Sequence, residues 1–208
     1  MSAIFGIINK SRNLLPPDTV QRISQVLQHR AIDGMDVWSA PYMVLAHFKL
    51  AMNEAERRQS MPLLTEDLVI TADIRLDNRH YLLQQTGAPA NCTNIVLLLH
   101  AWKKWKEACV AHLEGEYAFC IWNKVTQQCF LATDHIGFRA LYYYDSPEVF
   151  IFCSEQKGVE AFKPSPPRFN EVSLIEYYFR QSCPAATYDA DIWNLCGGNT
   201  LVLANGMM

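Results

Sequence analysis

Hydrophobic residues follow two different periods along this chain, and the period changes from segment to segment. Residues 3–8 are apolar and β-prone on both faces, which predicts a buried central strand close to the start of the chain. Residues 16–27 then show helical spacing behind a Pro-Pro-Asp start. Two short strands are predicted over 35–38 and 43–48, and a second central strand over 68–72.

The middle of the chain repeats this alternation. Polar residues at 53–60 predict a loop, and residues 81–85 predict a short helix. The clearest helix spans 95–105, because its apolar residues recur at i, i+3, i+4, i+7 and i+10. From Glu116 to Cys153 the period becomes two, and the short connections between the four predicted strands indicate an antiparallel meander.

A proline-rich stretch, 164–167, interrupts the pattern, and we place a boundary there. Residues 1–163 are predicted to form one domain and residues 164–208 a connector, with a helix over 172–178 and a last strand over 200–203. Two groups of strands with helices between and after them fit two antiparallel sheets, packed face to face and covered by helices. The expected fold class is therefore α+β.

Composition narrows the possible partners. Half of the 208 residues are hydrophobic and the net charge is -3, so there is no electrostatic reason to expect binding of nucleic acid or of an anionic membrane. No apolar run approaches the ~20 residues that span a bilayer. The start lacks the basic region of a secretory signal, and we expect a cytoplasmic protein.

The cysteines and histidines point away from disulfides and metals. There are seven cysteines, an odd number, and no Cys-x-x-Cys pair occurs. Several of them lie in apolar runs, which is typical of reduced, buried thiols. The six histidines show no metal-ligand spacing, so no metal site is expected.

Two stretches carry candidate chemistry. If Met1 is removed, Ser2 holds both a hydroxyl nucleophile and an α-amino base, although a buried first strand without chemistry explains the same residues. Charged residues crowd directly after the strand at 68–72, from Asp73 to Asn78. They are either a solvated turn or a site at the end of a central strand, and the pattern leaves both interpretations open.

The order of motifs resembles one known family. The matching residues are Ile4-Phe5-Gly6, Gln28-His29-Arg30, Asp33-Gly34, Leu45-Ala46-His47, Met61-Pro62-Leu63, Asp73 to Asn78, Leu99 to Trp102, Leu113 to Phe119, Asp134 to Gly137, Leu141-Tyr142-Tyr143 and Ser154-Glu155. Together, in this order over residues 1–160, they resemble the class II, N-terminal-nucleophile glutamine amidotransferase domain of asparagine synthetases, β-lactam synthetases and lasso-peptide cyclases. The resemblance implies an αββα four-layer sandwich, and residues 169–205 resemble the family's connector to its second domain.

Departures from the family fall on its working residues. The family's nucleophilic cysteine corresponds to Ser2, and its substrate-carboxylate arginine to Lys49, which lacks the bidentate fork. The Asn-Gly pair of the family's oxyanion hole corresponds to Asp73 and Ile74. The family's substrate-amine aspartate corresponds to Cys92.

We interpret these replacements as loss of glutamine hydrolysis in a domain that supports an ATP-dependent, amide-forming synthetase. The segment that contains Asp73 and Arg75 is reminiscent of the β-lactam synthetase and lasso-cyclase branches, and Arg75 is a further candidate for substrate binding. Two alternatives remain: a Ser2-dependent amidohydrolase that acts on another amide, and a stand-alone module that binds a peptide or partner.

The resemblance also sets expectations for cofactors and partners. The family's synthetase domain binds ATP through a Ser-Gly-Gly-x-Asp-Ser loop, whereas only Gly197-Gly198 occurs here and is interpreted as a turn. No cofactor is therefore expected in this chain, and ATP and Mg²⁺ are expected only if a synthetase domain is attached in cis or supplied by a separate chain. A homo-oligomer is also possible under this interpretation.

Overall fold

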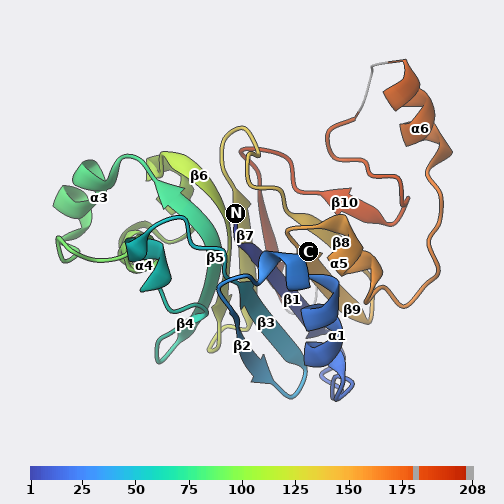
Figure 1. Cartoon of the computed structure of the whole chain (residues 1–208), viewed down its shortest axis with the longest axis horizontal. Helices are drawn as coiled ribbons and strands as arrows, with labels where there is room; N and C mark the ends of the chain where they lie inside the picture. The colour runs from blue at the N-terminus through green and yellow to red at the C-terminus, as the bar shows by residue number, and fades with distance from the viewer. Residues whose placement is uncertain (180–182, 205–208) are drawn as a thin grey trace.

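The computed structural model describes residues 1–179 and 183–204, apart from the side chain of Ala55. Two antiparallel sheets pack face to face, with helices on their outer sides (Figure 1). The first sheet has the order β10-β8-β9-β1-β3-β2. Its strands are β1 (Ala3–Asn9), β2 (Met35–Ala40), β3 (Met43–Phe48), β8 (Tyr142–Asp145), β9 (Val149–Cys153) and β10 (Ile192–Asn194).

The second sheet has the order β11-β7-β6-β5-β4. Its strands are β4 (Leu63–Leu64), β5 (Leu68–Leu76), β6 (Gly115–Asn123), β7 (Gln128–Thr133) and β11 (Thr200–Ala204). The α-helices are α1 (Thr19–Val26), α2 (Glu54–Arg57), α3 (Arg79–Thr86), α4 (Asn94–Trp105), α5 (Gln156–Glu160) and α6 (Glu171–Tyr178). Two 3₁₀ helices follow α1 and α4, at Gln28–Arg30 and Lys106–His112. Within the described residues, every helix is too short or too polar to cross a membrane.

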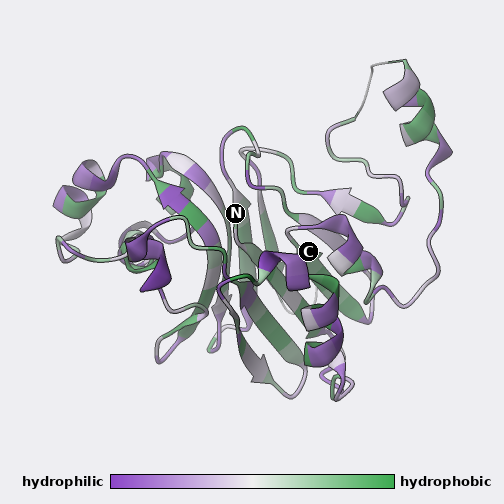
Figure 2. Ribbon diagram, viewed as in Figure 1, coloured by the Kyte–Doolittle hydropathy of each residue, from purple (hydrophilic) through white to green (hydrophobic). Residues whose placement is uncertain are grey.

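Three hydrophobic cores separate the four layers. One lies between the sheets, one lies under α3 and α4 against β5 and β6, and one lies under α1 and α5 against β1 and β3. Figure 2 shows hydrophobic residues along the central strands, whose side chains form these cores. Because every central strand is buried on both faces, the αββα sandwich expected from the resemblance is confirmed.

Strand β1 is the strand that joins two of these cores. It lies between β3 and β9, and its side chains alternate between the two faces of the first sheet. Ile4 and Ile8 enter the core between the sheets, whereas Phe5 and Ile7 enter the core under α1 and α5. The prediction of a central first strand is therefore confirmed.

Several local predictions need correction. The meander predicted from Glu116 onward is wrong, because β6 and β7 belong to the second sheet and β8 and β9 to the first. The loop predicted over 53–60 contains α2, whose N-cap Asn53 accepts a hydrogen bond from the Glu56 N–H. The solvated-turn interpretation of Asp73 is also wrong, because β5 continues through Leu76 in a ladder with β6.

The last strands bear on the proposed division of the chain. Residues 192–194 extend the first sheet and residues 200–204 extend the second. Gly197 and Gly198 form a turn, as expected, and the Gly198 N–H donates to the Asp134 carbonyl at 2.7 Å. The boundary at residue 164 stays a prediction, and the structure adds that strands from beyond it belong to both sheets.

Gly6 tests the packing of β1. A Cβ at this position would lie 2.1 Å from Cε1 of Phe152 and 2.9 Å from Cδ2 of Leu45. We therefore expect Gly6→Ala to lower the free energy of unfolding by ~1–3 kcal/mol, the usual effect of overpacking a core. Urea denaturation measures this change. Gln25→Ala on the exposed side of α1 is the control and should stay within ~0.5 kcal/mol of the parent. Equal stability of the two variants would contradict the packing argument.

Candidate functional site

A cavity of about 360 Å³ opens where β1 begins and β3 ends, beside β5. Five of the six residues singled out from the sequence line it: Ser2, Lys49, Asp73, Ile74 and Arg75. The sixth, Cys92, lines a neighbouring cavity, which shares three lining residues with the first. The fold therefore brings segments far apart in the sequence to one place, although the roles assigned to these residues stay predictions.

Ser2 is held by the main chain opposite it. Its Oγ accepts a hydrogen bond from the Leu50 N–H at 3.2 Å and lies 3.5 Å from the Leu50 carbonyl oxygen. The preceding residue is tied as well, because Arg30 Nη1 donates to the Met1 carbonyl at 3.3 Å. The position of Ser2 follows from β1, since Ala3 pairs with Phe48 at the end of β3.

Asp73 is a largely buried carboxylate on the central strand β5. Its side chain is 13 % exposed, and its Oδ2 accepts from Arg139 Nη1 at 3.1 Å. Burial raises the pKa of Asp73 to about 6, against the opposing pull of the Arg139 charge. The cavity wall thus carries a carboxylate that is costly to ionise and that has one cationic partner.

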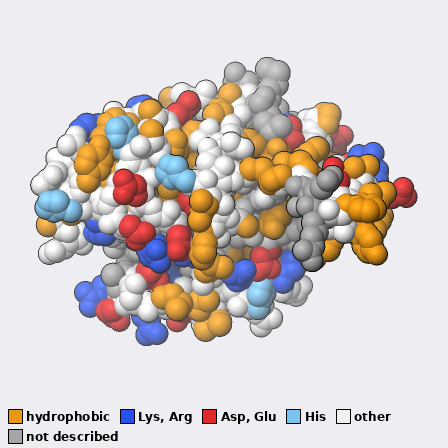
Figure 3. All heavy atoms as spheres, turned by 90° about the horizontal axis from the view of Figure 1, so that it is seen from above, with side chains coloured by type: hydrophobic (Ala, Val, Ile, Leu, Met, Phe, Trp, Pro, Cys, Tyr) orange, Lys and Arg blue, Asp and Glu red, His pale blue; other side chains and the backbone are white. Residues whose placement is uncertain are grey.

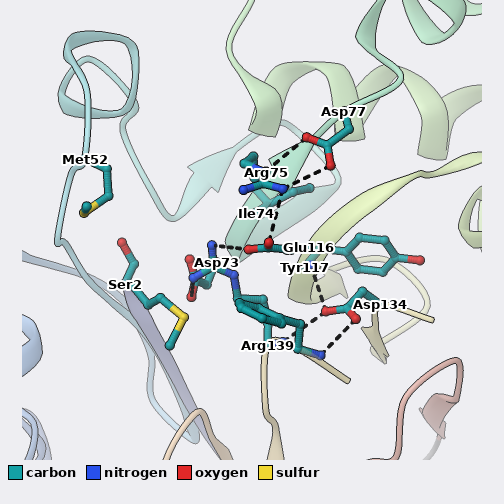
Figure 4. Close-up of polar contacts among 12 residues, drawn as sticks. Ser2, Met52, Asp73, Ile74, Arg75, Asp77, Glu116, Tyr117, Asp134 and Arg139 are labelled. Carbon is teal, nitrogen blue, oxygen red and sulfur yellow. Dashed lines mark hydrogen bonds and ion pairs between the residues drawn. The ribbon is translucent and has the colours of Figure 1, made fainter. Parts of the chain in front are cut away.

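The pair belongs to a longer series of ion pairs (Figure 4). Arg139 Nη2 lies 3.0 Å from Glu116 Oε2, and Glu116 Oε1 lies 3.1 Å from Arg75 Nη2. Arg75 then contacts Asp77 through Nε at 3.1 Å and Nη2 at 3.2 Å. Acidic and basic side chains therefore alternate from Asp73 in the cavity wall to Asp77 outside it, and each is paired with the next.

Asp134 holds the loop that presents Arg139. Its carboxylate accepts from the backbone N–H groups of Tyr117, Ile136, Phe138 and Arg139, at 3.2, 3.2, 2.9 and 3.0 Å. Burial opposes ionisation, but these N–H groups outweigh it and lower the pKa of Asp134. The ionised carboxylate stabilises the turn after β7, and the Arg139 side chain extends from this turn toward Asp73 (Figure 4).

The sequence pattern did not identify Arg139 and Glu116 as site residues. Glu116 lies within the matching stretch Leu113 to Phe119, and Arg139 lies two residues after the matching stretch Asp134 to Gly137. The available signal was charge balance: a buried carboxylate at position 73 requires a cation. Arg139 is 66 residues away from Asp73 in the sequence, so only the three-dimensional path of the loop between β7 and β8 shows that Arg139 is this cation.

Buried polar atoms without a hydrogen-bond partner gather at the same cavity. They are both ring nitrogens of His47, Oε1 of Gln59 and Nε of Arg139. Burial, assisted by the Lys49 charge, lowers the pKa of His47 to about 4, so the imidazole is neutral at pH 7. The cavity can therefore accept a polar guest without any added charge from His47.

Lys49 and Cys92 make contacts of a different kind. Lys49 Nζ donates to the Arg57 carbonyl at 3.4 Å, at the end of α2. The Cys92 carbonyl accepts from Arg79 Nη2 at 2.6 Å, which fixes the loop before α4. Within residues 1–179 and 183–204, no group of three or more His, Cys, Asp or Glu side chains is arranged to hold a metal ion.

Comparisons with known proteins agree with this architecture. The family model described as "Glutamine amidotransferase domain" matches residues 1–208. Asparagine synthetase [glutamine-hydrolyzing] 3 of Bacillus subtilis is 27% identical over 192 residues, which cover 86% of this chain and 30% of the relative. The putative asparagine synthetase [glutamine-hydrolyzing] 2 of Methanocaldococcus jannaschii is 25% identical over 201 residues, covering 86% and 39%. The chain thus spans only about a third of these relatives.

Two solved structures share the fold. The glutamine phosphoribosylpyrophosphate amidotransferase of B. subtilis superposes with a TM-score of 0.62 at 17% identity, covering 90% of this chain and 54% of the neighbour. A structure titled as the allosteric regulatory enzyme of purine biosynthesis superposes with a TM-score of 0.70 at 16% identity, covering 97% and 47%. Fold and family model agree, and the chain belongs to the class II glutamine amidotransferase domain family, with asparagine synthetases among its relatives.

Proposed function

We propose that this domain does not hydrolyse glutamine and instead supports an ATP-dependent, amide-forming synthetase. The observation that carries the proposal is the Asp73–Arg139 ion pair in the wall of the cavity that Ser2 also lines. An amidotransferase needs hydrogen-bond donors where the oxyanion forms. Here the corresponding position holds an acceptor whose cationic partner is already committed to two carboxylates.

The charge state of Asp73 sets the size of this effect. A pH of 7 is above the Asp73 pKa of about 6, so the carboxylate is mostly ionised. An ionised carboxylate donates no hydrogen bond. At ~4 Å and an effective dielectric constant of ~20, the carboxylate charge alone would repel a developing oxyanion by roughly 4 kcal/mol, an upper bound because the Arg139 charge offsets part of it. Loss of one oxyanion donor alone typically lowers the rate by ~10²–10³.

The remaining replacements act in the same direction. A serine hydroxyl is a weaker nucleophile than a cysteine thiolate. The Ser2 hydroxyl is also engaged with the Leu50 backbone. Cys92 lies in the neighbouring cavity and takes the place of the aspartate that would hold a substrate amine. Nucleophile and oxyanion donor are therefore altered at one cavity, and the amine anchor is altered at the next.

The relatives favour a synthetase partner. Two that match this chain are named asparagine synthetases, and this chain spans 30% and 39% of their lengths. We propose that a synthetase, in cis or as a separate chain, supplies the ATP and Mg²⁺ chemistry. The amidotransferase-like domain would brace and shape that synthetase.

A Ser2-dependent amidohydrolase is the rival function, and the open cavity beside Ser2 is the observation that favours it. This chemistry needs a free α-amine on Ser2 and therefore removal of Met1. Intact-mass measurement of the purified protein decides whether Met1 is present. A mass that includes Met1 excludes the rival.

Ammonia release tests the main proposal. We expect the parent protein and Ser2→Ala to release ammonia from glutamine at the same background rate, because the parent lacks a working oxyanion site. The asparagine synthetase 3 of B. subtilis serves as the positive control in the same assay. Ser2-dependent ammonia release by the parent, at a rate more than tenfold above background, would refute the proposal.

The pH dependence of stability tests the buried charge. The pKa of Asp73 is raised from 3.8 to about 6, so its contribution to stability is full below pH ~4 and is lost as the pH rises through ~6. Asp73→Asn removes this titration. The stability of the variant relative to the parent should therefore rise by up to ~3 kcal/mol between pH 4 and pH 7. Urea denaturation across this pH range measures the difference in the free energy of unfolding between variant and parent. His47 titrates in both proteins, so its contribution cancels in this difference. A flat difference would show that Asp73 is not buried as a charge.

A further inference from the structure

The helix α6 carries an apolar surface that is open to solvent. Half of the large hydrophobic side chains that are exposed in the described residues fall between Phe169 and Trp193. On α6 and just after it, the exposed fractions are 64% for Val172, 56% for Ile175, 82% for Tyr178 and 69% for Phe179. We call these four residues, with Leu174 at 44%, the α6 face. Elsewhere the exposed hydrophobic side chains lie singly or in pairs, as they do on most proteins.

The α6 helix stands away from the sandwich. It has eight residues and buries none of them, and Figure 1 shows it clear of both sheets. Figure 3 shows hydrophobic side chains gathered at the end of the molecule where α6 lies. Isolated helices shorter than ~12 residues are marginal in water, so a helix of this length needs packing to persist. Its capping bond, from the Ser173 N–H to Asn170 Oδ1 at 3.1 Å, does not supply that packing.

A hollow lies on the other side of α6. A cavity of about 270 Å³ lies between α6 and the segment 183–194, and Ser173, Glu176 and Tyr177 line it from the helix. None of these residues belongs to the α6 face, and helical spacing places them on the opposite side of the helix. The α6 face therefore points away from this hollow.

Charge further limits the occupant. The two charged side chains on α6 are acidic, Glu171 and Glu176. A second copy of the same face would bring these acids toward one another. A partner with an apolar patch and a basic rim fits better.

From these features we infer that the α6 face is the docking surface for the ATP-dependent synthetase. The inference rests on the function proposed above. This chain spans about a third of its asparagine synthetase relatives, so the remainder of such a protein offers a large surface for burial against this domain. The α6 face is the largest group of exposed apolar side chains in the described residues and is the surface that gains most from being covered.

Site-specific photo-crosslinking tests the inference. The photoreactive residue p-benzoylphenylalanine replaces Tyr178 in the complete polypeptide, which is expressed in the organism that it comes from. In a control variant the same photoreactive residue replaces Val125. Val125 is a matched position because it is 77% exposed, on the turn between β6 and β7. We expect position 178 to crosslink at least tenfold more than position 125. Mass spectrometry identifies the crosslinked peptide. We expect this peptide to come from a domain that contains a Ser-Gly-Gly-x-Asp-Ser loop, in the same chain or in another.

A charge-insertion pair supplies the second measurement. Leu174→Glu should weaken co-purification with that synthetase at least tenfold, or loosen the two domains to limited proteolysis if they share a chain. Val125→Glu should change neither. Because Leu174 is not part of the core, equal thermal unfolding of both variants checks that the fold is intact.

The outcomes separate this inference from the proposed function. Crosslinking of position 178 to a second copy of the chain, to a protein without the ATP loop, or no more than at position 125, overturns the docking surface. If the synthetase co-purifies unchanged with Leu174→Glu, the docking surface fails while the proposed function stands. If no synthetase associates and glutamine is hydrolysed, both fail.

Discussion

Pairing of β1 between β3 and β9 is the constraint on which the cavity depends. The first strand has hydrogen-bonded neighbours on both edges and a hydrophobic core on both faces. Ser154 continues this ladder at the start of β1, since its Oγ accepts from the Ile4 N–H at 2.9 Å and its own N–H donates to the Ile4 carbonyl at 3.0 Å. Pairing on both edges from the first residues of β1 therefore places Ser2 beside Leu50, just after the end of β3.

The site built around this placement is neutralised from within. Asp73 lies on the cavity wall, and the turn held by Asp134 places Arg139 beside it. Arg139 also contacts Glu116, so its charge is shared before any ligand arrives. Strand β5 contains no glycine and continues as a regular ladder with β6 through Leu76. The polar groups on this side of the cavity are therefore paired mainly with one another.

Two surfaces of the domain hold side chains without partners, unlike the paired charges around Asp73. The cavity beside Ser2 keeps unpartnered atoms of His47 and Gln59, and the α6 face keeps hydrophobic side chains in water. Both leave favourable interactions unmade in the isolated chain. Gln59 and the α6 face lie outside the strands, where substitutions disturb the cores least, whereas His47 lies on β3. A domain that supports a partner would be expected to change at such places while its sandwich persists.

Hydrophobic period and turn residues in the sequence determined most strands, the main helices and the two-sheet architecture, because each depends on which residues leave water, whereas the short strands β4 and β10 were not predicted. The nearby pairing of β2 with β3 follows from this local pattern. Periodicity did not place β6–β7 and β8–β9 in different sheets, since strands with the same alternation fit either one. Nor did it reveal that Asp73 is buried and paired with Arg139, because charge balance depends on distance in space and 66 residues separate the two. Only the tertiary structure decided that Ser2 and Asp73 line one cavity while Cys92 lines the next, since packing of the sheets sets which loops meet.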